Sequence, residues 1–201
     1  MKYLLMVMLS LLSVPLLADD TNVFINKTVG IQLVKPDAWV FMTADQNLES
    51  LKQLDMKDKE FHQTMVKYSS VPLVAMARHK EPFDDLNPSF KLNVKPLGQF
   101  KGASAVTIAE YLVRPMSKYF DDFRIMQSPV GVTVGGLEAG YVRINYSLAI
   151  PDGRKFPTTS EIWVVPRGDY FFMIGAGTRQ DEATGNRDDI AAIIDSIKFL
   201  K

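Results

Sequence analysis

Tyr141-Val-Arg-Ile-Asn-Tyr-Ser-Leu-Ala-Ile150 opens the part of the sequence that decides the fold, residues 135–201. The stretch is rich in β-branched and aromatic residues, which favour β-strands. It ends at Pro151-Asp-Gly153, and Asp-Gly after an apolar run predicts a tight turn because glycine adopts positive φ without steric cost. Residues 156–165 and 170–176 repeat the pattern on either side of Pro166-Arg-Gly-Asp169. We therefore expect two long β-hairpins that share their middle strand.

The last of these strands, and the segment after it, indicate how the sheet is covered. Residues 170–176 are apolar throughout, so both faces of this strand should be buried. A helical face follows at the spacing i, i+3, i+4, i+7, and it consists of Ile190, Ile193, Ile194 and Ile197. Asn186 is the expected N-cap of this helix, with Asp188 and Asp189 in its first turn. We expect this helix to cover one face of the sheet and the mid-chain helix to cover the other.

Further strands are expected upstream. Residues 23–26 and 30–34 predict an opening hairpin, and residues 71–77 predict a third strand. Residues 90–96 alternate as a half-buried strand does, with Phe90, Leu92 and Val94 on one side and Lys91, Asn93 and Lys95 on the other. The loop between these two strands contains Asp84-Asp85, and we favour a solvated turn over a metal-binding pair because no further ligands follow at a suitable spacing.

Two upstream regions have the periodicity of helices. From Asp45 onwards, two short helices and one interrupted helix fit the pattern equally well. Thr107-Ile-Ala-Glu110 matches a capping box, in which both side chains satisfy free backbone N–H groups. The helix expected after it buries Ile108, Tyr111, Leu112, Met116, Tyr119 and Phe120. Pro115 must kink or interrupt this helix because it lacks a backbone N–H. Gly135-Gly136 then predicts a turn or bulge.

The N-terminus has the pattern of a cleaved secretory signal peptide. Lys2 precedes an apolar run at residues 4–17, and cleavage is expected between Ala18 and Asp19. The run is shorter than the ~20 residues of a membrane-spanning helix, and no cysteine follows that could carry a lipid anchor. We therefore expect residues 1–18 to be a signal peptide. Residues 19–201 are expected to form a single domain in the periplasm or outside the cell, without a stable membrane anchor.

Composition and motifs exclude several functions. The chain has 23 basic and 23 acidic residues with no basic run, which gives no electrostatic footprint for nucleic acid. It contains no cysteine, so disulfides, cysteine nucleophiles and cysteine-ligated metals are excluded. The two histidines, His62 and His79, stand among charged residues and are expected at the surface. No common catalytic motif is present. We expect no catalytic residues, no metal and no cofactor.

Several stretches resemble a known family. They are Gly30-Ile-Gln-Leu-Val-Lys-Pro-Asp-Ala-Trp39, Phe120-Asp-Asp-Phe123, Gly136-Leu-Glu-Ala-Gly-Tyr141 and a terminal helix expected from Ile190 to Phe199. Together they make the chain similar to proteins of the PsbP-like fold. The resemblance implies an α+β class, with an α/β/α sandwich around a curved, mainly antiparallel sheet of about six strands and helices on both faces. It also implies an accessory or binding role more often than catalysis.

Three charged residues fall on or near the predicted sheet: Glu138, Arg143 and Glu161. Charged groups in such positions must be paired or face an open surface. Arg143 and Glu161 lie at similar distances on either side of the Asp152-Gly153 turn, so they are candidates for a cross-strand pair. We favour a structural pair and keep a ligand-binding pair as the alternative.

Three functions remain open on this basis. The first is a non-catalytic exported accessory protein that binds another envelope protein. The second is a small-molecule or peptide-binding protein with an apolar pocket between the sheet and the helices. The third is a carboxylate-dependent hydrolase, because the proximity of two carboxylates cannot be read from sequence. The oligomeric state is left open.

Overall fold

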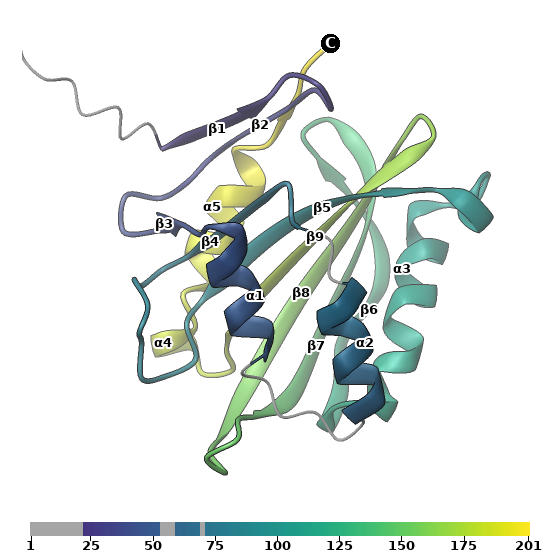
Figure 1. Ribbon diagram of the computed structural model, residues 1–201. Helices are drawn as coiled ribbons and strands as arrows, with labels where there is room; N and C mark the ends of the chain where they lie inside the picture. Colours follow the sequence, from purple (N-terminus) through teal and green to yellow (C-terminus); the bar gives the residue numbers. More distant parts are fainter. Residues whose placement is uncertain (1–21, 53–58, 69–70) are drawn as a thin grey trace, which may run out of the picture.

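The computed structural model describes residues 22–52, 59–68 and 71–201, and the predicted signal peptide with its cleavage site, Ala18 and Asp19, lies outside these residues. A seven-stranded antiparallel sheet forms the centre of the molecule, in the order β3-β4-β5-β9-β8-β7-β6 (Figure 1). Its strands are β3 (Val40–Phe41), β4 (Val74–Ala77), β5 (Ser89–Pro96), β6 (Asp121–Val134), β7 (Leu137–Ala149), β8 (Lys155–Arg167) and β9 (Tyr170–Arg179). The α+β class is confirmed, with one strand more in this sheet than expected.

The predicted hairpins are confirmed as the long meander β7-β8-β9. All three strands extend beyond the predicted stretches, and Gly153 and Gly168 adopt positive φ in the two turns. Strand β6 is one continuous strand of 14 residues. Its pairing with β7 shifts register three times, so the strand is bulged along its length.

A second, three-stranded sheet joins the two ends of the described chain. It consists of β1 (Val23–Asn26), β2 (Ile31–Val34) and β10 (Lys198–Phe199), so the expected opening hairpin is confirmed. The expected helix up to Phe199 is wrong, because α5 (Arg187–Asp195) ends four residues earlier. The chain leaves the helix because Phe199 pairs with β2 and the N–H of Leu200 donates to the carbonyl of Gly30 at 2.8 Å. The C-terminus therefore lies beside this small sheet (Figure 1).

Helix α5 and the small sheet cover one face of the large sheet. The four predicted isoleucines are all buried there, although Ile197 follows the helix. They pack against aromatic and aliphatic side chains of both sheets, including Leu33, Trp39, Phe90, Leu92, Phe172 and Ile174. Trp39 Nε1 also donates to Asp189 Oδ2 at 2.9 Å, which fixes the start of α5 to the loop after β2.

Asn186 precedes α5 as predicted, but its side chain makes no cap hydrogen bond. It adopts the left-handed conformation with φ 53°, a region that asparagine tolerates better than most residues. This conformation ends the short helix α4 (Glu182–Gly185) and starts α5 directly after it. Asp181 is the side-chain cap in this region, and it accepts from the N–H of Thr184 at 2.9 Å.

Helix α3 (Ala105–Val113) packs on the opposite face, between the 3₁₀ turns η1 (Gly98–Phe100) and η2 (Arg114–Lys118). The predicted capping box is wrong. Ser104 is the N-cap and accepts from the N–H of Thr107 at 3.1 Å, so the helix starts three residues before the predicted position. The expected burial of Tyr111 is also wrong, because the buried face of α3 consists of Ala105, Ile108, Ala109 and Val113, and Tyr111 is 53% exposed. Pro115 lies just after the end of the helix, as the second residue of η2, so the expected interruption is confirmed.

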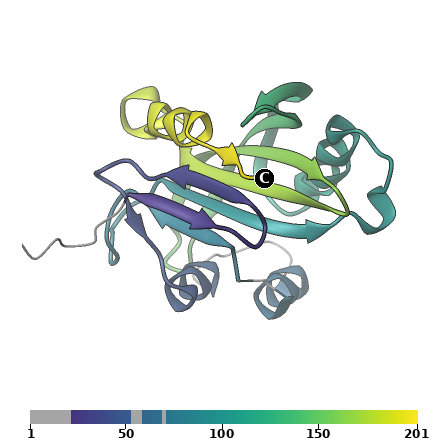
Figure 2. The ribbon, with the colours of Figure 1, turned by 90° about the horizontal axis from the view of Figure 1, so that it is seen from above.

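Helices α1 (Ala44–Lys52) and α2 (Lys59–Tyr68) correspond to the region where one or two helices were expected. The structure describes them as two helices, with residues 53–58 outside the described part. Figure 2 shows them next to each other, on the side of the molecule away from α5. None of the helices in the described residues is long and apolar enough to span a membrane.

Candidate functional site

A pocket of about 510 Å³ lies on the face of the large sheet opposite α5. Strands β5, β9 and β8 form its floor, α1 and the α3–η2 segment form its sides, and the loop between β4 and β5 forms its rim. This volume falls in the range of pockets that hold small organic ligands. The pocket is therefore the candidate functional site of the described chain.

Strand register explains which side chains point into the pocket. Lys91 of β5 lies opposite Gly175 of β9, and Gly175 lies opposite Ile162 of β8. Side chains alternate between the two faces of a strand, so the neighbours Phe90 and Leu92 point to the α5 side and are fully buried there. The predicted alternation of β5 is thus confirmed, and its polar side is the pocket floor.

Two glycines on β9 keep the floor open. A Cβ added to Gly175 would meet no atom within 4 Å, and one added to Gly177 would meet only Ser89 Oγ, at 3.4 Å. Both glycines share the pocket face because they are two residues apart in a strand. The pocket therefore exists partly because the segment Gly175-Ala-Gly177 places no side chain on this face.

The walls of the pocket are mostly apolar. They include Leu51, Leu112, Met116, Phe120, Leu148, Ile150, Ile162 and Met173. The buried Tyr146 adds a polar group to this lining, and its hydroxyl lies 3.0 Å from Ser160 Oγ. Burial raises the pKa of Tyr146, so it is a neutral hydrogen-bonding group at physiological pH. Its ring packs against Phe120 with ring centroids 4.2 Å apart, which joins the floor to the α3–η2 wall.

Lys91 is the cationic side chain of the pocket floor. It is half-buried, and burial lowers the pKa of its ammonium group because low-dielectric surroundings disfavour the charged form. Within the described residues, no carboxylate or carbonyl forms an ion pair or hydrogen bond with this ammonium. An uncompensated cation on an apolar floor is costly to bury, so its position there requires an explanation.

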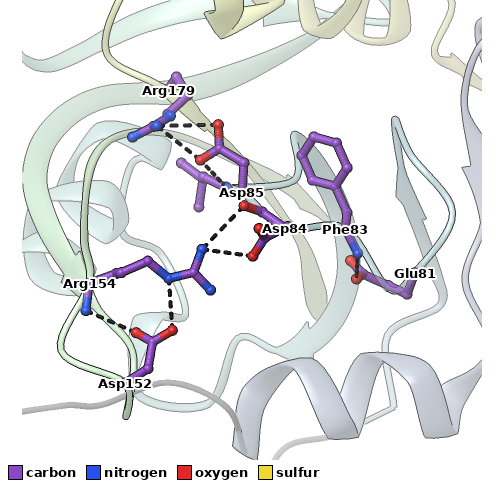
Figure 3. A network of polar contacts seen from close by, with 8 residues as sticks. Glu81, Phe83, Asp84, Asp85, Asp152, Arg154 and Arg179 are labelled. Carbon is purple, nitrogen blue, oxygen red and sulfur yellow. Dashed lines mark hydrogen bonds and ion pairs between the residues drawn. The ribbon is translucent and has the colours of Figure 1, made fainter.

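The rim loop is tied to the sheet by arginines on two other elements (Figure 3). Arg154, in the turn between β7 and β8, forms ion pairs with Asp84 at 2.8 Å and with Asp152 at 2.7 Å. Arg179, at the end of β9, forms an ion pair with Asp85 at 2.9 Å. Asp84 and Asp85, once weighed as a metal-binding pair, are thus each engaged by an arginine. These contacts hold the rim loop over one end of the pocket.

The two histidines each contact a residue that lines the pocket. His79 stacks on Phe83 of the rim loop with ring centroids 4.1 Å apart, and His62 Nε2 lies 2.8 Å from the carbonyl of Leu51. Phe83 and Leu51 both line the pocket, so the histidines support its walls from outside.

Arg143 and Glu161, the predicted candidate binding residues, lie elsewhere. They are direct cross-strand partners in β7 and β8. Their side chains share the α5 face of the sheet, because Glu161 is in register with the core residue Ala176. The Glu161 carboxylate is buried and forms its ion pair with Arg187, at 3.2 Å, rather than with Arg143. The structure does not bring this pair of side chains to the pocket floor. At residue 161, only the backbone of β8 contributes to the floor.

Glu161 also accepts a hydrogen bond from the hydroxyl of Tyr141. Burial, followed by this hydrogen bond and the negative charge of Glu161, raises the pKa of Tyr141. Glu161 thus links β7, β8 and the first residue of α5 through Tyr141 and Arg187. This arrangement is typical of a structural anchor that fixes the start of α5.

Sequence reasoning kept an apolar pocket between the sheet and the helices as an alternative, but it did not identify Lys91 or the other residues that line the pocket. Two features of the sequence could have served as signals. Strand β9 has glycine at two alternate positions, Gly175 and Gly177, and the polar face of β5 carries Lys91. Neither signal predicts a pocket by itself, because the depth of the pocket depends on where α1, α3 and the rim loop lie.

Comparisons with known proteins give similarity of fold. No protein-family model matches the chain, and no curated protein matches its sequence. Among solved structures, LpqN of Mycobacterium tuberculosis, described as involved in cell envelope biogenesis, is 15% identical with a TM-score of 0.50, over 85% of this chain and 83% of LpqN. The cyanobacterial PsbP of Synechocystis is 12% identical with a TM-score of 0.49, over 88% and 91% of the two chains.

A protein from Bacteroides thetaiotaomicron is also similar, at 12% identity and a TM-score of 0.47; the match covers 90% of this chain and 49% of that protein. The solved structures similar to this chain thus include a PsbP. At these identities the similarity concerns the fold alone.

Proposed function

We propose that this protein is an exported, non-catalytic binding protein that holds a small, largely apolar molecule in the pocket between β5, β9, β8 and α3. The observation that carries the proposal is the open floor at Gly175, where a pocket of ligand size is left unfilled by side chains. Interiors normally pack to the density of organic crystals, and an apolar space of this size is costly unless a ligand fills it.

The other functions considered from the sequence find less support. The two carboxylates that line the pocket, Glu81 and Asp85, are both engaged: Glu81 accepts from the N–H of Phe83 at 2.9 Å, and Asp85 pairs with Arg179. This disfavours carboxylate-dependent hydrolysis, which needs one acid free to transfer a proton. Export is supported by the apolar run at residues 4–17, and cell fractionation tests it.

Binding of another envelope protein is kept as a second candidate function. The edge strand β6 exposes three apolar side chains, Ile125, Met126 and Val130, with 48%, 50% and 40% of their surfaces accessible. An edge strand with exposed apolar groups can accept a partner strand. Mild crosslinking at native abundance should return a defined partner if this function is correct.

The pocket is tested with N-phenyl-1-naphthylamine, a neutral dye whose fluorescence rises in an apolar site. We expect the wild-type protein to bind it and Gly175→Leu to bind it at least tenfold more weakly, because the leucine side chain fills the floor. Gly131→Leu is the matched control, since Gly131 is an exposed strand glycine on β6, outside the pocket. A wild-type protein that leaves the dye fluorescence unchanged and binds neither decanol nor decanoate would refute the proposed function.

A further inference from the structure

The ammonium of Lys91 is the feature of the pocket that apolar binding alone leaves unexplained. In register, Lys91 lies between Ala75 of β4 and Gly175 of β9, so its two cross-strand neighbours are too small to cover it or to pair with it. The nearest side chains on its own face of β5 are Ser89 and Asn93, which are uncharged. The polar groups on the floor around Lys91 thus leave its positive charge unbalanced.

The acidic groups of the pocket are committed to other partners. Asp85 forms an ion pair with Arg179, and Glu81 accepts from the N–H of Phe83 and from the amide of Asn87 at 2.8 Å. Both belong to the rim loop, whereas Lys91 belongs to the floor. A lysine that served only to stabilise the fold would be expected to pair with a carboxylate, because an unpaired buried charge is destabilising.

We infer that the ligand of this pocket is an amphipathic acid, whose carboxylate pairs with the ammonium of Lys91 and whose apolar body lies against Leu112, Met116 and Phe120. The inference rests on the proposed function and specifies the ligand class for the same site. A charge-assisted hydrogen bond in a partly dehydrated site is about twice as strong as a neutral one, so the carboxylate would restore what burial of Lys91 costs.

The chemistry of the floor favours a monoanion with an apolar body. Phosphate groups carry more charge and are usually held by arginines or by several backbone N–H groups, whereas Lys91 is a single point charge. A peptide would bring a row of backbone polar groups against walls that are mostly apolar, and these groups would lose their hydrogen bonds to water. A carboxylate on a hydrocarbon chain would pair with the ammonium of Lys91, and the chain would pack against the apolar walls.

The inference is tested by isothermal titration calorimetry with decanoate and with decanol, which share a chain and differ in the charged head group. We expect the wild-type protein to bind decanoate at least tenfold more tightly than decanol. Lys91→Met, which keeps the length and volume of the side chain, should weaken decanoate binding at least tenfold and leave decanol binding within twofold. Lys91→Arg keeps the charge and should preserve the preference for decanoate.

Lys101→Met is the matched control, because Lys101 is an exposed lysine paired with Asp169 outside the pocket. It should bind both compounds as the wild type does. Equal loss of both compounds in Lys91→Met would assign Lys91 a packing role and overturn the inference, as would unchanged decanoate binding in that variant. If the wild-type protein binds the naphthylamine dye but not decanoate, the inference alone fails. If it binds neither dye nor decanoate nor decanol, the proposed function fails with it.

Discussion

We expect Lys91 to favour ligand binding and, at the same time, to lower the stability of the ligand-free protein. Its ammonium is half-buried on an apolar floor, and burial lowers its pKa from the ordinary value of 10.5. An unpaired polar group that is removed from water costs ~1–3 kcal/mol. Natural proteins accept such costs chiefly at functional sites, where stability is given up for activity.

Replacing this lysine should therefore stabilise the ligand-free protein. We expect Lys91→Met to raise the free energy of unfolding at pH 7 by about 1 kcal/mol, because the variant no longer buries an ammonium in part. This difference in the free energy of unfolding between Lys91→Met and the wild type should become smaller as the pH rises. Between the lowered pKa of the folded protein and 10.5, the unfolded chain still holds the proton that the folded protein has released, so wild-type stability increases with pH in this window.

Urea unfolding of both proteins at pH 7 and at pH 10 measures this difference. The comparison between the two proteins cancels the titration of other groups, which they share. Lys101→Met serves as the control, since it removes an exposed lysine outside the pocket. A gain in Lys91→Met that is the same at both pH values would contradict the explanation based on burial of charge.

At the scale of single residues, the sequence could predict which face of a strand a side chain lies on. It could not predict which residue that side chain contacts. The alternation of β5 placed Lys91 on the polar side of its strand, and the turn at Asp152-Gly153 placed Arg143 opposite Glu161. The actual partner of Glu161 is Arg187, which comes from another element 26 residues later. Such a contact depends on how α5 lies on the sheet, and local spacing contains no information about that.

At the scale of elements, the contact between α3 and β7 determines the shape of one pocket wall. The start of α3 lies directly above Gly140, where an added Cβ would be 2.3 Å from the carbonyl oxygen of Ala105. A side chain at Gly140 would therefore push the helix away from the sheet. Leu112, at the other end of α3, lines the pocket and would move with it.

We expect Gly140→Ala to lower the free energy of unfolding by about 3 kcal/mol, since an overpacked contact against backbone cannot be relieved by rotating a side chain. Gly175→Ala is the control, because its Cβ would point into open space and its effect should stay within about 0.5 kcal/mol. Thermal and urea unfolding measure both variants. Equal stability of Gly140→Ala and the wild type would show that α3 is free to shift on the sheet.

The elements themselves were largely predictable, and their ends were not. Turn residues and apolar alternation located β7, β8, β9 and the opening hairpin. The start of α3 was misplaced because Thr107-Ile-Ala-Glu110 fits the capping pattern, while Ser104 upstream provides the hydroxyl that caps the helix. The end of α5 was misplaced because Ile197 continues the helical spacing, although pairing with β2 draws the chain out of the helix.

At the scale of the whole molecule, Arg167 joins the large sheet to the small one. It lies at the end of β8, and its guanidinium donates to the carbonyls of Val29 at 3.1 Å, Gly30 at 2.7 Å and Leu200 at 2.5 Å. These carbonyls belong to the β1–β2 turn and to the C-terminus. One side chain thus fixes both ends of the described chain to the meander.

Arg167→Met should lower the free energy of unfolding by about 2–4 kcal/mol, because several buried or half-buried carbonyls lose a charged donor. The loss should be accompanied by faster amide hydrogen exchange in β2 and β10. Arg154→Met removes an arginine from exposed ion pairs and should leave global stability close to that of the wild type. Unchanged exchange in β2 and β10 of Arg167→Met would indicate that apolar packing alone holds the small sheet.

The pocket belongs to this largest scale, and this is why the sequence offered it only as an alternative and could not specify its lining residues. Its floor is built from strands that are distant in the sequence, and its sides come from α1, α3 and the rim loop. The sequence predicts each of these parts separately. The space between them is determined by the curvature of the sheet and by the two glycines of β9, which become informative only when the register with β5 is known.

The order of the strands also has a consequence for how the chain folds. Strands β6 to β9 are joined by short turns and pair with their neighbours in the sequence. They can therefore pair one after another with little loss of chain entropy. Strand β5 pairs with β9 only by closing a loop that contains all of β6, β7 and β8, which is the slower kind of step. Because β5 carries Lys91, we expect the charged end of the pocket to form after the β6–β9 meander. A bound acid would therefore recognise only the fully folded chain and would retard its unfolding.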